Sequence, residues 1–198
     1  MTRVGRPTLH DTERLLDVAE ALAAERGPSG VTMAGVARAA GAPSGSLYHR
    51  FGNRTVLLGE VWLRVVMRFQ LGFLEALTIE PAVEAGVAAA RHVIGWIRSH
   101  EAETRILLRG PAEFGEADWP PELRARVDAR QRELEAALRR TAERLPGRRT
   151  DALERVMLAT VDIPRATGRR HLRPDSGTVP SGIEPLVEEC VRALLEPR

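Results

Sequence analysis

Small and hydrogen-bonding residues gather in one short segment of the chain. They are Ser44, Gly45, Ser46, Tyr48 and His49. Hydroxyl and imidazole groups can hydrogen-bond to phosphate oxygens and to the edges of bases. If the segment begins a helix at Pro43, its first backbone N–H groups also favour anions. The segment therefore has the chemistry of a surface that binds a polyanion.

Catalytic and metal-binding chemistry has little support in the sequence. There is no lysine, which excludes a Walker A lysine and a Schiff base on an internal lysine. The single cysteine excludes an internal disulfide and any multi-cysteine metal site. No HExxH, GxSxG or GxGxxG motif occurs, and the five histidines lack metal-ligand spacing. We therefore expect no enzyme, no metal and no cofactor.

Three short helices are expected to position this polar segment, at about 9–26, 32–40 and 43–50. Gly41 supplies the turn between the second and third helices, and Leu47 offers an apolar side chain to a shared core. The third helix is too short to bury much, so its outward polar side chains are free to contact a ligand. This pattern predicts a helix-turn-helix, whose third helix enters the DNA major groove.

The remainder of the chain also has helical spacing. Helices are expected at about 55–77, 82–98, 101–109, 121–145, 150–163 and 183–196. Pro164 should end or kink the fifth of these, with an arginine-rich, solvated loop at 165–173 after it. No segment alternates polar and apolar residues, so we expect no strand. The predicted fold class is all-α, with a helix-turn-helix domain at 9–54 and a helical domain at 55–198.

The positive charge is unevenly placed. The formal net charge is only +2, but the stretch from Arg26 to Arg54 has four arginines and no acidic residue. Such a stretch is a modest indication of a polyanionic partner. No apolar run approaches the roughly 20 residues that span a bilayer, and the first thirty residues lack a signal-peptide pattern. These features favour the cytoplasm.

Residues 32–54, TMAGVARAAGAPSGSLYHRFGNR, resemble the TetR-like (tetracycline-repressor-like) family of transcriptional regulators. The matching positions are Thr32, the pair Val36-Ala37, Ala40-Gly41, Leu47-Tyr48, the aromatic Phe51 and a basic residue at Arg54, where arginine replaces the usual lysine. The preceding LLDVAEALAAERG is similar to the first helix of the family. Four positions depart from the pattern, namely Ala23, Gly35, Ser44 and Arg54, and none removes the motif.

The resemblance implies a set of DNA contacts in this chain. They fall on Thr32, Met33, Ser44, Gly45, Ser46, Tyr48, His49 and Arg54, with Arg3 and Arg6 as a minor-groove arm. We expect the Tyr48 hydroxyl and the Arg54 guanidinium to meet phosphates. No arginine or asparagine on the third helix is placed to read base edges, so DNA shape should contribute to recognition.

The resemblance also implies an effector pocket and a dimer. The pocket candidates are Trp62, Phe69, Phe73, Trp96, Phe114 and Trp119, with Arg91 and His92 as possible polar groups. The dimer would form a four-helix bundle through Leu153, Val156, Met157, Val161, Leu186, Cys190, Val191 and Leu194. Cys190 is interpreted as a packed small hydrophobe rather than a redox sensor.

Two functions remain open at this stage. The first is a ligand-responsive dimeric regulator at a palindromic double-stranded DNA operator, with a small hydrophobic or amphipathic effector. The family resemblance favours a repressor. The alternative is a DNA-binding protein of the same fold that has no small-molecule effector and is controlled by a protein partner.

Overall fold

The computed structural model describes residues 9–147, 150–172 and 179–197, and these residues form helices and turns with no strand. The α-helices are α1 (Leu9–Arg26), α2 (Met33–Ala40), α3 (Ser44–Phe51), α4 (Arg54–Ala76), α5 (Ala82–Ser99), α6 (Glu101–Arg109), α7 (Pro121–Glu143), α8 (Ala152–Met157), α9 (Ile163–His171) and α10 (Ile183–Leu195). Short 3₁₀ turns are η1 (Pro28–Gly30), η2 (Pro111–Phe114) and η3 (Glu116–Asp118), and η4 (Leu158–Asp162) is a π-helical turn. The predicted all-α fold is confirmed. None of these helices has the length and apolar character needed to cross a bilayer.

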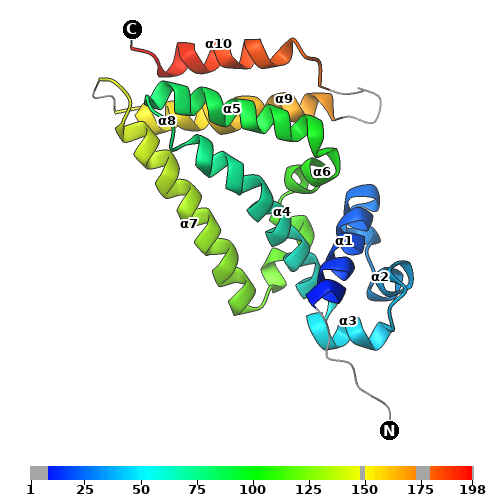
Figure 1. Cartoon of the computed structure of the whole chain (residues 1–198). Coiled ribbons are helices and arrows are strands. Elements are labelled where there is room, and N and C mark those ends of the chain that lie inside the picture. Colours follow the sequence, from blue (N-terminus) through cyan, green and yellow to red (C-terminus); the bar gives the residue numbers. More distant parts are fainter. Residues whose placement is uncertain (1–8, 148–149, 173–178, 198) are drawn as a thin grey trace.

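Two lobes are joined by the long helix α4. The helices α1 to α3 form a small unit at one end of the molecule, and α10, α5 and α8–α9 form a layer at the other (Figure 1). From the small unit α4 runs towards this layer, and α7 packs along α4 (Figure 1). The start of α4 is fixed by Asn53, whose side-chain oxygen accepts a hydrogen bond from the Val56 N–H at 2.9 Å.

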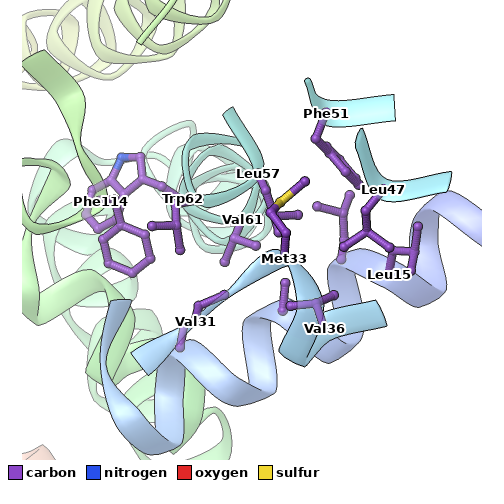
Figure 2. Close-up of a cluster of buried hydrophobic side chains, with 14 of the residues drawn as sticks. Leu15, Val31, Met33, Val36, Leu47, Phe51, Leu57, Val61, Trp62 and Phe114 are labelled. Carbon is purple, nitrogen blue, oxygen red and sulfur yellow. The ribbon is translucent and has the colours of Figure 1, made fainter. Parts of the chain in front are cut away.

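A first apolar core holds the small unit together and continues along α4. Leu15, Val36 and Leu47 pack from the three short helices against Leu57 and Val61 of α4 (Figure 2). The same cluster takes in residues of α6, η2 and α7, and Trp119, which follows η3; it includes the fully buried Phe114. The small unit is therefore seated on the neighbouring helices as well as on α4.

A second core lies among α4, α5, α7, α8 and α10, around Phe73 and Ile94. Two glycines on separate helices allow close helix contacts there. A Cβ atom at Gly86 of α5 would lie 2.3 Å from a Leu195 methyl group of α10, and one at Gly168 of α9 would lie 2.4 Å from an Ile97 methyl group of α5. The close packing of this layer therefore requires glycine at both positions, since a Cβ atom at such distances would clash with the facing methyl group.

The expected loop after Pro164 is wrong in its described part. Arg165, Arg169, Arg170 and His171 lie in α9, which continues to His171. Pro164 occupies the first turn of α9, where a missing backbone N–H costs little. The π-helical turn that precedes it alters the hydrogen-bond pattern, so the chain passes the proline without leaving the helix.

Candidate nucleic-acid interface and internal cavity

The helix α3 exposes one polar face and buries one apolar face. Leu47 and Phe51 are buried in the first core, whereas Ser44, Gly45 and His49 are exposed. Tyr48 is 55% exposed, which is unusual for a large aromatic side chain. The outward polar face predicted from the sequence is therefore free to contact another molecule.

The turn before α3 is built from local capping interactions. Thr32 caps α2, because its hydroxyl oxygen accepts a hydrogen bond from the Gly35 N–H at 3.0 Å. A Cβ atom at position 35 would lie 2.8 Å from that oxygen, which accounts for glycine here. Gly41 ends α2 in the left-handed region, at φ 64°. The Ser46 hydroxyl donates to the Pro43 carbonyl at 2.7 Å, so this residue also serves the start of α3.

Besides Thr32 and Ser46, two more of the expected DNA contacts have intramolecular partners in the structure. Met33 is buried in the first core. Arg54 donates from Nε to the Val31 carbonyl and from Nη2 to the Pro28 carbonyl, each at 2.5 Å. Its guanidinium ties the start of α4 to the segment before α2, a link that the spacing of the motif did not indicate.

Arg54→Ala is expected to destabilise the fold. The substitution removes two hydrogen bonds and leaves two carbonyls without these donors, so unfolding should become easier by about 1–3 kcal/mol. Urea denaturation measures this loss. Arg38→Ala is the matched control, because Arg38 is an exposed arginine on α2 and its loss should leave stability within about 0.5 kcal/mol. Equal stability of the two variants would show that the Arg54 hydrogen bonds contribute nothing.

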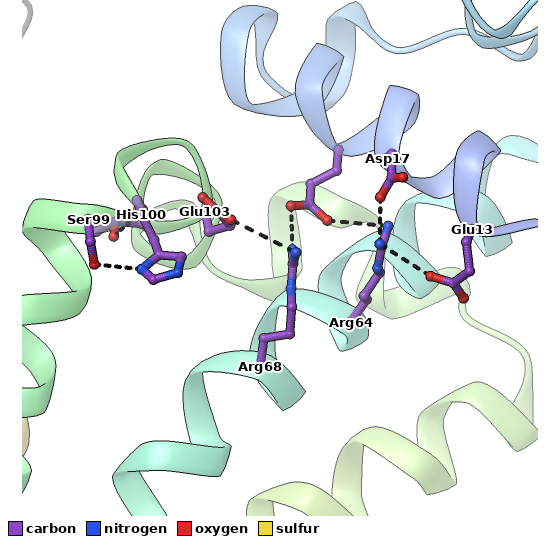
Figure 3. Close-up of polar contacts among 9 residues, drawn as sticks. Glu13, Asp17, Arg64, Arg68, Ser99, His100 and Glu103 are labelled. Atoms are coloured by element: carbon purple, nitrogen blue, oxygen red, sulfur yellow. Dashed lines mark hydrogen bonds and ion pairs between the residues drawn. The ribbon is translucent and has the colours of Figure 1, made fainter. Parts of the chain in front are cut away.

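Three acidic residues of α1, Glu13, Asp17 and Glu20, pair with arginines of α4. Arg64 Nη2 lies 2.5 Å from Asp17 and 3.2 Å from Glu13 (Figure 3). Arg68 binds Glu20, which is largely buried, and lies 3.9 Å from Glu103 of α6 (Figure 3). These pairs fix α1 against α4.

A cavity of about 270 Å³ lies between α4, α5, α6 and the π-helical turn. Trp62, Phe69, Phe73 and Trp96, four of the six aromatic candidates from the sequence, line it. Its other walls are Val66, Gln70, Val93, Ile97, Thr104, Leu107, Leu108, Gly110, Pro111, Gln131, Leu134, Thr160, Val161 and Arg165. The lining combines an apolar majority with a few polar groups, which is typical of a small-molecule site.

The other two aromatic candidates do not line this cavity. Phe114 is fully buried against Trp62, with ring centroids 5.4 Å apart. The Trp119 indole donates to the Phe114 carbonyl at 3.1 Å and packs over Gly59, where a Cβ atom would lie 2.7 Å from the indole nitrogen. Both rings belong to the first core. The sequence could not show this, because spacing along the chain does not indicate which side of α4 a ring covers.

Neither of the expected polar groups on α5 lines the cavity. Arg91 forms a two-point ion pair with Glu188 of α10, with Nη2 to Oε2 at 2.7 Å. His92 is half-buried, and its Nε2 lies 2.9 Å from the Phe69 carbonyl. Since a carbonyl only accepts, Nε2 must carry the hydrogen. Gln70, Thr104 and Thr160 take the polar positions instead, and a helical pattern without the neighbouring helices could not select them.

His92 should make stability depend on pH. Burial lowers its pKa from the usual 6.5, and this outweighs the hydrogen bond to Phe69, which raises it; the His100 charge lowers it further. The unfolded chain therefore binds a proton more readily, so this contribution to stability is present above pH 6.5 and is lost as the pH falls below it. His92→Gln keeps a donor and should show a smaller loss of melting temperature between about pH 6.5 and 5. An equal loss of melting temperature over this pH range in the wild type and in His92→Gln would contradict the assignment to His92.

The dimer candidates divide into three groups by exposure. Val156 and Val191 are fully buried in the second core of one chain. Leu153, Met157, Val161 and Leu194 are partly buried against the same core. Leu186 is 58% exposed and Cys190 is also exposed. Leu158, which the sequence analysis did not select, is 44% exposed on the π-helical turn. The arm residues Arg3 and Arg6 lie outside the described residues.

A small helix-turn-helix unit exposes a polar third helix, and one long helix joins this unit to a larger helical lobe with an aromatic cavity. Units of this kind can place the third helix in the DNA major groove. Residues 15–61 match the sequence pattern of the family described as bacterial regulatory proteins, tetR family. This part of the chain is therefore similar to that family, as the resemblance of residues 32–54 predicted. No curated protein matches the sequence.

Solved structures of TetR-family regulators share the fold over nearly the whole chain. PfmR from Thermus thermophilus has 21% identity and a TM-score of 0.67, with 98% of each chain covered. KstR2 of Mycobacterium tuberculosis, a ketosteroid transcriptional regulator, has 19% identity and a TM-score of 0.67, covering 99% of this chain and 100% of its own. AibR, solved with isovaleryl coenzyme A and operator DNA, has 22% identity and a TM-score of 0.68, covering 95% and 100%. At these identities the likeness establishes the fold.

Proposed function

We propose that this chain is a dimeric transcriptional regulator, most simply a repressor, that releases a palindromic operator when a small molecule enters the cavity. The observation that carries the proposal is the exposed polar face of α3 on a surface segment without acidic residues. The division into a DNA-binding domain at 9–54 and a ligand-binding and dimerisation domain at 55–198 is part of the proposal.

The proposed DNA contacts come from two elements. Ser44 and Gly45 bring backbone N–H groups of the first turn of α3 to a phosphate, and Tyr48 donates its hydroxyl to another. His49 contacts a base edge or a phosphate one residue further along. Thr32, at the exposed start of α2, adds a phosphate contact beside its capping role. Arg54 holds the unit in shape through its carbonyl contacts and supplies positive charge nearby.

The long helix α4 provides the proposed link from ligand to DNA. Its Trp62, Phe69 and Gln70 line the cavity, and its Arg64 and Arg68 bind the acidic residues of α1. A ligand that displaces α4 therefore moves α1 and the two helices packed on it. In a dimer this displacement changes the distance between the two α3 helices, which must span a fixed distance along the DNA. AibR is a precedent for a chain of this fold that binds both isovaleryl coenzyme A and operator DNA.

The proposed dimer uses the exposed apolar residues of α10 and the π-helical turn, two elements that pack together. Leu158→Arg with Leu186→Arg should weaken the dimer by at least about 100-fold, because two charges per chain would be buried in an apolar interface. Sedimentation velocity at several concentrations measures the change. Leu71→Arg is the control, since Leu71 is 75% exposed on α4. A double variant that remains as dimeric as this control would exclude the assigned surface.

Operator binding is tested by a fluorescence anisotropy titration with duplexes from the region upstream of the coding sequence. If each half-site neutralises about three phosphates, log K should fall with log salt with a slope near −5 for the dimer. Tyr48→Phe should weaken binding by about tenfold, because it removes one hydroxyl donor and leaves the ring in place. Failure to bind any such duplex, or a strictly monomeric protein, would overturn the proposal.

A further inference from the structure

Two residues that line the cavity carry buried polar atoms without a hydrogen-bond partner among the described residues. They are Oε1 of Gln70 and Nε1 of Trp96. The two side chains are only 6% and 9% exposed, so water outside the protein does not satisfy these atoms. Buried polar groups normally have partners, and an orphaned group in a cavity wall points to a missing ligand.

The two groups differ in what they demand of a ligand. The Trp96 indole nitrogen can only donate, whereas the Gln70 amide offers both a carbonyl oxygen and an NH₂ group. The two threonine hydroxyls of the lining are already donated, from Thr104 to the His100 carbonyl and from Thr160 to the Val156 carbonyl, each at 2.8 Å. The ligand must therefore carry an acceptor for Trp96. A donor on the ligand would satisfy the Gln70 oxygen, and a second acceptor could take a hydrogen bond from the Gln70 NH₂ group.

The charge and the size of the cavity restrict the chemical class of the ligand further. Arg165 is the one charged residue among the described residues that line the cavity, so a cationic ligand would find no counter-ion there. A buried cation without a counter-ion is strongly unfavourable. The cavity of about 270 Å³ holds on the order of ten to fifteen non-hydrogen atoms when packed at protein density. The aromatic walls suit a flat ring or a short branched chain.

We propose that the cavity binds a small aromatic or branched aliphatic molecule, neutral or singly negative, whose carbonyl or carboxylate oxygen accepts a hydrogen bond from Trp96, and that it rejects cations of the same shape. This inference rests on the proposed effector role of the cavity, and it adds the chemical class of the effector. A coenzyme A thioester is too large to be enclosed there.

Four probes with the same phenylalkyl body test the class on the full-length protein. They are 4-phenylbutan-2-one, 3-phenylpropanoate, butylbenzene and 3-phenylpropylammonium. Titration followed by tryptophan fluorescence and by calorimetry should show the ketone and the carboxylate binding about tenfold more tightly than butylbenzene, and no binding of the ammonium compound. Equal affinity for butylbenzene and the ketone, or tight binding of the ammonium compound, would overturn the proposal.

Trp96→Phe identifies the donor, because it removes the N–H group and keeps a ring. It should reduce ketone affinity about tenfold, to the level of butylbenzene, while butylbenzene affinity stays the same. Trp119→Phe is the matched control, since that indole donates to the Phe114 carbonyl and lies outside the lining. An equal loss for both ligands in Trp96→Phe would mean that the site was deformed, and would count against the assignment.

A second variant keeps the test informative if Trp96→Phe unfolds. Gln70→Met replaces the amide with an apolar group of similar length. It should weaken binding of 3-phenylpropanoate, whose second oxygen can accept from the Gln70 NH₂ group, and strengthen butylbenzene binding. Unchanged selectivity would overturn the role of Gln70.

Operator binding is measured on the same preparations. Protein that binds an operator but none of the four probes overturns the ligand class alone, and protein that binds the ketone selectively but no DNA overturns the regulatory function.

Discussion

Replacing Gly45 by glutamate is expected to abolish operator binding without unfolding the protein. A Cβ atom at position 45 would meet no atom within 4 Å, and the residue is exposed in the first turn of α3. The fold can therefore accept the side chain, and an acidic group in the first turn favours a helix. On the proposed DNA surface the same carboxylate would face phosphates. We expect a loss of at least about 100-fold in affinity, or ~2.7 kcal/mol, in an anisotropy titration.

Two further substitutions at position 45 separate charge from bulk. Gly45→Gln has nearly the same size as the glutamate variant without its charge, so it should lose less affinity, and its salt dependence should match that of the wild type. Gly45→Ala should raise thermal stability slightly, because alanine favours a helix by up to about 1 kcal/mol over glycine. Wild-type affinity in Gly45→Glu would show that the start of α3 does not approach DNA.

Phe114→Ala is expected to be the most destabilising of the substitutions considered. Phe114 is fully buried beside Trp62, and its carbonyl accepts the hydrogen bond from Trp119. Truncating a buried phenylalanine costs about 3–5 kcal/mol through lost contacts and the cavity left behind. For a chain of this size the melting temperature should fall by roughly 10 °C. Denaturation by urea and by heat measures both quantities.

The same substitution decides between core and pocket for this ring. Leu71→Ala, at a side chain 75% exposed on α4, should change stability by less than about 0.5 kcal/mol and serves as the control. If Phe114 belongs to the core, as its contacts show, Phe114→Ala should retain the ketone selectivity under conditions where it is folded. A stable Phe114→Ala protein with altered probe binding would contradict this placement.

The features that depend on local sequence could be predicted. The three short helices, the Thr32 cap, the Gly41 turn and the outward position of Tyr48 all follow from interactions within a few residues along the chain. Four aromatic cavity residues were also found, because they lie on the expected helices with helical spacing. Those residues could be recognised without knowing how the helices pack.

The remaining features depend on contacts between distant segments. Phe114 and Trp119 are aromatic, as the wall of a ligand pocket often is. In the fold Phe114 packs on Trp62 and Trp119 packs over Gly59, and both partners are far away in sequence. The carbonyl partners of Arg54 lie more than twenty residues before it, so its type alone suggested a phosphate. Gln70 is an ordinary polar residue in sequence, and only the packing of α4 on its neighbours leaves its oxygen buried and unpaired.

One helix shared between two cores has a thermodynamic consequence. Leu57 and Val61 of α4 are buried in the first core, and Phe73 and Leu77, in the same segment, are buried in the second. Neither lobe can unfold alone without removing α4 from one of its two cores, so the two lobes should melt in one cooperative transition. Binding of a small molecule in the larger lobe would then protect the amides of the distant helix α3 against hydrogen exchange, even with no contact between the ligand and α3.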